Sequence, residues 1–230
     1  LEHAIRGVTG QEIRVNGAGR TDTGVHALGQ VASVRVATHV PTARLRAALN
    51  AHLPRDVRVL RVAEAPDSFH ARFSAVWRRY RYLLAREELP FLQGRAWIPK
   101  GWPELEPMQA ALPCLLGEHE FRGFTTQPDA PFGCFVHEAR WERWEGGFAF
   151  VIRSNRFLYQ MVRILVGTCV EIGRGKRPVE GLATALAAGD RRAAGMLAPS
   201  CGLYLTDVGY DPPWPEDPPA TVTGPPLGRP

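Results

Sequence analysis

The alternation of apolar and polar residues predicts several strands along the chain. A period of two residues, or an enrichment in β-branched side chains, is typical of strands. Such segments occur at residues 13–17, 31–36, 57–62, 69–84, 136–144, 148–153 and 202–208. Glu145, Gly146 and Gly147 separate two of them, which predicts a hairpin.

The segment over residues 69–84 is the longest predicted strand. Its alternation puts Arg78, Tyr80, Tyr82 and Leu84 on one face and Trp77, Arg79, Arg81 and Leu83 on the other. Arginines interleaved with aromatic rings suit an RNA-binding surface. They equally suit a strand at the edge of a sheet that keeps its arginines in water. The pattern leaves both interpretations open.

Apolar residues that recur every three or four positions predict helices between the strands. The chain begins with an amphipathic helical pattern that has no capping residue before it. Thr42 can cap a helix that Pro54 ends, and Ser154 can cap an apolar helix that runs to about Gly173. Two more helices are expected over residues 105–116 and 179–188.

The prolines and glycines of residues 85–105 indicate a connection between two halves of the chain. We expect an N-terminal half over residues 1–95, a C-terminal half over 105–211, and a disordered Pro-rich tail over 212–230. Each half mixes strands with one or two helices, which predicts an α+β fold. Because the pattern starts in mid-helix, we also expect the amino end to be truncated.

Composition narrows the class of protein. The chain has 230 residues, of which 45% are hydrophobic, so it can bury a substantial core. It shows no apolar run of membrane-spanning length and no signal-peptide pattern, so we expect a cytoplasmic protein. The four cysteines are widely spaced, and we expect them to be reduced and to hold neither a metal nor a disulfide.

The net charge of +5 gives a weak indication of a polyanionic partner. Of the 28 basic residues only Lys100 and Lys176 are lysines. The planar guanidinium of arginine suits phosphates and stacked bases better than an ammonium does. A GC-rich genome or a thermophilic host would produce the same bias.

A glycine-rich turn, Gly17-Ala-Gly-Arg-Thr-Asp22-Thr-Gly-Val-His26, presents one acidic residue between two predicted strands. It is not a dinucleotide fingerprint, because Asp22 stands at the third glycine position and would repel a pyrophosphate. The chain also lacks the Gly-Lys-Ser/Thr of a P-loop. On local composition alone, Asp22 could simply hydrogen-bond the backbone of its own loop.

Five motifs in order resemble the TruA family of tRNA pseudouridine synthases. They are residues 19–26, Phe69-His-Ala-Arg-Phe-Ser-Ala75, Arg79-Tyr-Arg-Tyr82, Phe157-Leu-Tyr-Gln-Met-Val-Arg163 and Gly202-Leu-Tyr-Leu205. The resemblance covers residues 1 to about 211. It departs mildly at Thr23, where the family often has alanine, and in the loop lengths after Leu84 and Phe124.

The resemblance implies two similar halves whose strands form one continuous, largely antiparallel sheet with a basic cleft, and a homodimer. It identifies Asp22 as the catalytic nucleophile. Conversion of uridine to pseudouridine breaks the bond from ribose to N1 and rejoins the uracil through C5. An aspartate can attack C1′ or C6, and elimination is a third route; the sequence leaves all three open. Glycoside hydrolysis would need a second carboxylate to activate water.

The resemblance also implies roles for residues outside the turn. Tyr80 would stack on the flipped uracil or help to move the C5 proton, whereas pattern alone favours core packing. Arg163 is the only charged residue between Arg156 and Glu171, so either it pairs with a carboxylate, for which Asp22 is the family's partner, or its stem reaches solvent. Substrate-binding roles are expected for Arg20, Leu203, His70 and Arg72.

The sequence therefore predicts an isomerase that needs no cofactor and no metal and acts on tRNA. The resemblance implies uridines of the anticodon stem and loop, at positions 38 to 40, as its targets. The alternative is a non-catalytic RNA-binding module with the same basic cleft. A metal-dependent nuclease is disfavoured, because no carboxylate cluster or HExxH motif accompanies Asp22.

Overall fold

A computed structural model describes residues 1–211, and the predicted tail at 212–230 lies outside the described residues. The chain divides into two compact units. Of the described residues, the first contains 1–20, 30–75 and 209–211, and the second contains 21–29 and 76–208. The expected halves, 1–95 and 105–211, stay a prediction. Both units run across that expected division, and the second includes Asp22 as well as Arg163.

The first unit is built on two helices, α1 (Glu2–Thr9) and α2 (Thr42–His52). Ala4, Ile5 and Leu49 are buried between them, with partly buried apolar residues around this small core. Two short strands, β1 (Asn16–Gly17) and β3 (Ala32–Ser33), pair antiparallel. The strands predicted before and after the Asp22 turn are thus present but only two residues long.

Three predictions fail in the first unit. Thr42 does not cap α2: Pro41 occupies the capping position, and the Thr42 hydroxyl donates to Glu64 Oε1 at 3.1 Å. Residues 57–62 form no strand. The Asn50 side chain takes the place of a strand partner, donating to Val59 O at 2.9 Å and accepting from Val59 N at 2.8 Å.

Residues 69–74 are the third failure, because they curl into a turn instead of extending the strand that follows. The backbone N–H of Ser74 donates to His70 O at 2.9 Å, which closes the turn. The long strand β4 begins only at Ala75 and runs to Ala85.

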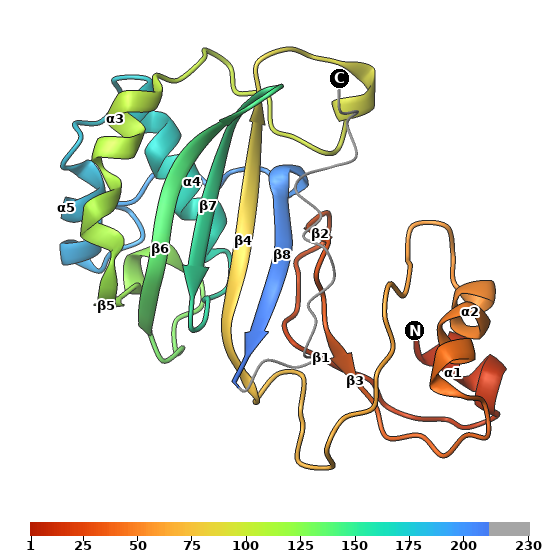
Figure 1. The fold of residues 1–230 in the computed structure, drawn as a ribbon. Coiled ribbons are helices and arrows are strands. Elements are labelled where there is room, and N and C mark those ends of the chain that lie inside the picture. The colour runs from red at the N-terminus through yellow and green to blue at the C-terminus, as the bar shows by residue number, and fades with distance from the viewer. Residues whose placement is uncertain (212–230) are drawn as a thin grey trace. The chain divides into compact units, whose positions relative to one another are not determined.

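The second unit contains a six-stranded sheet with the order β2-β8-β4-β7-β6-β5 (Figure 1). The other strands are β2 (His26–Ala27), β5 (Gly117–Glu120), β6 (Gly133–Trp144), β7 (Gly147–Ser154) and β8 (Leu203–Tyr210). β4 with β7, β7 with β6 and β6 with β5 are antiparallel, whereas β2 and β8 are parallel. The predicted hairpin is confirmed as β6 and β7.

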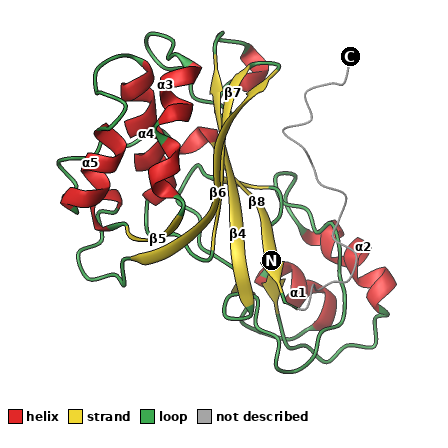
Figure 2. Ribbon diagram, turned by 60° about the vertical axis from the view of Figure 1, so that its left-hand side comes forward, coloured by secondary structure: helices red, strands yellow, loops and turns green. Residues whose placement is uncertain are grey.

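Helices α3 (Leu105–Ala110), α4 (Met161–Gly173) and α5 (Gly181–Ala188) gather on one face of this sheet (Figure 2). The core lies between the two layers, where Tyr82 and Leu84 of β4 and Phe150 of β7 join Met161 and Leu165 of α4. The predicted faces of β4 explain this packing. Helices beside strands in both units confirm the α+β class.

Two helix predictions need correction in the second unit. Ser154 ends β7 and donates to Phe135 O at 2.8 Å, so it caps no helix; α4 starts after Gln160, whose φ is +61°. The helix expected over 105–116 is split, with α3 followed by a 3₁₀ turn at Leu112–Leu115. Pro113 explains the break, because it lacks the N–H that would continue an α-helix.

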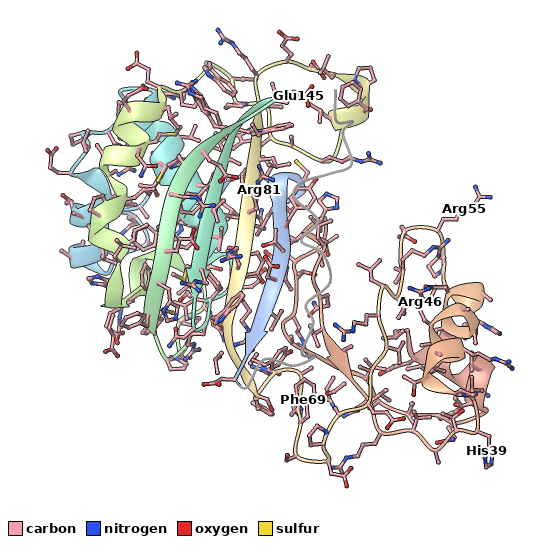
Figure 3. The ribbon with its side chains drawn as sticks, viewed as in Figure 1. His39, Arg46, Arg55, Phe69, Arg81 and Glu145 are labelled. Carbon is pink, nitrogen blue, oxygen red and sulfur yellow. The ribbon has the colours of Figure 1, made fainter. Side chains whose placement is uncertain are left out.

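The arginines of β4 that face away from the helices form ion pairs with neighbouring strands. Arg81, labelled in Figure 3, lies 3.0 Å from Glu142 of β6. Arg79 lies 3.6 Å from both Glu138 and Asp207. Carboxylates therefore neutralise much of the charge that suggested an RNA surface on this strand. None of the helices in residues 1–211 is long and apolar enough to cross a membrane.

Candidate active site

The segment that carries Asp22 is held on the sheet of the second unit. Val25 N donates to Asp22 O at 3.0 Å, and Leu28 N donates to Leu205 O of β8 at 2.8 Å. Gly24 has φ +80°, and a Cβ at this position would lie 2.6 Å from Ser200 Oγ. The backbone angle therefore favours glycine here, and a larger residue would also have to displace the Ser200 hydroxyl.

His26 helps to fix this segment. Its ring stacks on Tyr204 with centroids 4.7 Å apart, and its Nε2 lies 2.9 Å from Gly94 O. Tyr204 in turn donates its hydroxyl to Arg95 O at 2.6 Å, and burial raises its pKa to about 12. His26 thus has structural partners on β8 and on the loop before residue 95.

Arg163 of α4 pairs with Asp22. Its Nη1 donates to Asp22 Oδ2 at 2.9 Å, and its Nε donates to Ala198 O at 2.8 Å. The side chains are 13% and 23% exposed, so water screens the pair only partly. Within residues 1–211, no hydrogen bond or ion pair engages the other carboxylate oxygen, Oδ1. The arginine thus fixes one oxygen and leaves the second available.

Tyr80 is the third side chain of the candidate site, after Asp22 and Arg163. Its ring meets the edge of Phe157 with centroids 4.9 Å apart. Burial raises the pKa of Tyr80 to about 12, Arg78 opposes the shift, and the Asp22 carboxylate adds to it. The influence of Asp22 on this pKa places the two side chains in one electrostatic environment. At neutral pH the Tyr80 hydroxyl is protonated.

Leu203 begins β8 and is only 6% exposed, within the core of the second unit. The preceding Gly202 permits a close approach to β4, since a Cβ there would lie 2.7 Å from Tyr82 Cε1. Arg20, His70 and Arg72 belong to the first unit, and their substrate-binding roles stay predictions.

The sequence reasoning missed two parts of the site, the ring of Phe157 and the carbonyl of Ala198. Phe157 opens one of the recognised motifs, so its presence there was a usable signal. A backbone carbonyl has no sequence signature. In the described residues, no group of three or more His, Cys, Asp or Glu side chains could hold a metal ion.

The fold and the site define an α+β protein that holds a carboxylate by a fixed arginine near a partly buried tyrosine, an arrangement suited to nucleophilic catalysis. Comparison with known proteins shows to which family within this class the chain belongs. The sequence profile of the tRNA pseudouridine synthase family matches residues 1–74 and 111–211. The chain belongs to this family, an isomerase family, which confirms both the resemblance and the predicted enzyme class.

Individual proteins of this family are similar to the chain over most of its length. The tRNA pseudouridine synthase A of Parvibaculum lavamentivorans is 42% identical over 217 residues, which cover 92% of this chain and 88% of the relative. The protein of the same name from Thermus thermophilus is 41% identical over 217 residues, covering 91% and 85%. That of Thermoanaerobacter pseudethanolicus is 38% identical over 214 residues, covering 91% and 88%.

Proposed function

We propose that this protein isomerises uridine to pseudouridine in tRNA, at positions 38 to 40 of the anticodon stem and loop, with Asp22 as the nucleophile. The observation that carries the proposal is the Asp22–Arg163 ion pair of 2.9 Å, which holds a carboxylate with one oxygen still available. The names of the relatives, tRNA pseudouridine synthase A, support tRNA as the substrate.

The reaction breaks the N1–C1′ bond and forms a C5–C1′ bond. The proton on C5 leaves and N1 of the product carries a proton, so no atom is gained or lost. Asp22 can attack C1′ or C6, or can assist an elimination. In each case Arg163 would hold Oδ2 and leave Oδ1 available to act on the substrate. A single carboxylate suffices, because no water has to be activated.

Tyr80 has two possible parts in this reaction. Its ring can restore the stacking that a flipped uracil loses. Its hydroxyl, protonated at neutral pH because its pKa is about 12, can donate a hydrogen bond or relay a proton, but is no ready base. Leu203 would pack on the other side of the uracil, and Arg20 would fill the place of the flipped base or contact a phosphate.

The remaining parts of the proposal concern the setting of the reaction. We expect activity without cofactor or metal, a homodimer, a basic cleft that binds the tRNA, and a cytoplasmic location. His70 and Arg72 would contact RNA. If metal is not required, product formation by purified protein continues unchanged in EDTA, and loss of activity on chelation would argue for a metal-dependent mechanism.

The decisive experiment maps pseudouridine in an unmodified tRNA transcript treated with the purified protein. Wild type should form it at the proposed positions. Asp22→Asn should bind tRNA and form no product. Asp207→Asn is the matched control, because it removes a carboxylate of similar exposure, 29%, that also pairs with an arginine. Product formation by Asp22→Asn would contradict the nucleophile, and binding without product in wild type would favour the non-catalytic RNA-binding module.

A further inference from the structure

Phe73 is exposed to a degree that is unusual for an aromatic residue. The residue is 77% exposed, the largest value among the large apolar residues of the described chain. Single exposed apolar residues are common on protein surfaces and by themselves carry no meaning. The setting of Phe73 distinguishes it from such residues.

The turn that carries Phe73 is rigidly held. His70 N donates to Ser74 Oγ at 3.0 Å, and His70 Nδ1 accepts from the backbone N–H groups of Arg72 at 3.1 Å and Phe73 at 3.3 Å. The backbone that presents the ring is therefore ordered, so a ligand that contacts the ring has little backbone entropy to offset.

The turn is also fixed to the rest of the first unit. Ala71 is fully buried; its N–H donates to Ser33 Oγ at 3.1 Å, and its carbonyl accepts from the Tyr210 hydroxyl at 2.8 Å. Phe69, labelled in Figure 3, packs on the ring of Tyr210 with centroids 5.0 Å apart. Phe69 is thus partly buried and anchors the turn, whereas Phe73, four residues later, is exposed to solvent.

The surroundings of Phe73 are cationic and polar. The Arg72 guanidinium lies 5.6 Å from its ring centroid, and the His70 ring lies 4.4 Å from it. The first unit as a whole is also basic, since residues 1–20 and 30–75 contain ten arginines and five carboxylates. An aromatic face beside arginines suits a nucleobase with its phosphate better than an apolar protein surface.

We propose that Phe73 is a stacking platform for an unpaired nucleobase of the substrate RNA, with Arg72 providing positive charge beside it. The proposal rests on the proposed function, because it takes RNA as the ligand. It adds a binding residue in the first unit, whereas the Asp22–Arg163 pair lies in the second. The contact acts on affinity and leaves the chemical step to Asp22.

The test measures the equilibrium affinity of the full chain for an unmodified tRNA transcript at fixed salt. Phe73→Ala should bind about 5- to 150-fold more weakly, the range for one stacked base. Phe73→Tyr should bind as wild type does, and Phe73→Leu should resemble Phe73→Ala because it keeps apolar area and loses the π face. Phe91→Ala, which truncates a 52% exposed ring in the second unit, is the control and should bind normally.

Two further readouts separate stacking from other roles. The slope of log affinity against log salt should be unchanged in Phe73→Ala and should become shallower by about one unit in Arg72→Ala, if Arg72 contacts a phosphate. Transcripts with single abasic nucleotides identify the partner base. At one unpaired position the abasic change should weaken wild type and have no further effect on Phe73→Ala.

Several outcomes would overturn the proposal. They are unchanged affinity in Phe73→Ala, full affinity in Phe73→Leu, absence of any abasic position coupled to Phe73, and a changed oligomeric state in Phe73→Ala, which would indicate a protein contact. Binding is measured apart from turnover. A wild type that binds tRNA through Phe73 but makes no pseudouridine would therefore contradict the proposed function and leave this inference standing.

Discussion

The two compact units differ in how they are stabilised. The second has a continuous core between a six-stranded sheet and three helices, which includes Tyr82, Phe150 and Leu165. The first has a small apolar core of Ala4, Ile5 and Leu49, surrounded by partly buried apolar residues, and side-chain hydrogen bonds add to its stability. Since apolar burial is the main stabilising term, the second unit is expected to be the more stable of the two.

This difference in stability matches the proposed roles of the two units, which are catalysis in the second and RNA binding in the first. Asp22, Arg163 and Tyr80 belong to the second unit, where a large core can hold them in fixed positions. The first unit contains Arg20, His70, Arg72 and the exposed Phe73, which are proposed to bind RNA. Chemistry demands positions fixed to fractions of an ångström, whereas contacts to phosphates tolerate adjustment. The following experiments test the comparison.

The largest effect is expected from the core of the second unit. Phe150 is fully buried, and Phe150→Ala should lower the free energy of unfolding by about 3–5 kcal/mol. Leu49→Ala should destabilise the first unit and leave the protection of α4 against hydrogen exchange unchanged. Hydrogen exchange resolved by peptide measures both variants. Equal loss of protection in both units from Leu49→Ala would show that the two unfold together.

The second-largest effect is expected from Arg163, the arginine that fixes Asp22. Arg163→Ala frees Asp22 to move and should lower the single-turnover rate about 100-fold, the effect of a misplacement of about 1 Å. Arg163→Lys should fall between this variant and wild type, because an ammonium restores charge without the fork that contacts both Asp22 and Ala198. Arg153→Ala, which removes an arginine 33% exposed on β7, is the control. A normal rate in Arg163→Ala would remove Arg163 from the site.

Alkaline pH should lower the stability of the second unit. Burial raises the pKa values of Tyr80, Tyr204 and Cys169 to about 12 and that of Cys134 to about 11. The folded state therefore keeps protons that the unfolded state releases near pH 9 for the thiols and pH 10 for the tyrosines.

The stability from these groups is complete below about pH 9 and decreases as pH rises toward 12, by about 1.4 kcal/mol for each unit of pKa difference. Urea unfolding at pH 7.5 and pH 10.5, with reductant present, measures this loss. A free energy of unfolding that is equal at both values would contradict the burial of these groups.

The success of the sequence predictions varies between the units for a physical reason. The β6–β7 hairpin was predictable because its alternating residues pair across a two-residue turn, Glu145-Gly146. The Asp22–Arg163 pair joins residues 141 positions apart, so no local pattern reveals it, and only the recognised motifs brought both residues to notice. The prediction of a strand over 57–62 was wrong because the Asn50 side chain, and not a neighbouring strand, forms hydrogen bonds with the backbone of Val59.

The smallest predicted effect concerns Asn50, whose side chain takes the place of a strand partner for Val59. Asn50 both donates to and accepts from the backbone of Val59, so Asn50→Ala leaves two partly buried backbone groups without their partner. The expected loss is about 1–2 kcal/mol, confined to the first unit. Asn50→Asp should lose at least as much, because one carboxylate oxygen still accepts from Val59 N but the other replaces the donor to Val59 O and is repelled by it. With tRNA saturating, the rate of pseudouridine formation should stay at the wild-type value in both variants, since Asp22, Arg163 and Tyr80 are held by the core of the second unit. A rate that falls together with the stability of the first unit would mean that the catalytic residues depend on that unit for their positions, and the contrast between the two units would then fail.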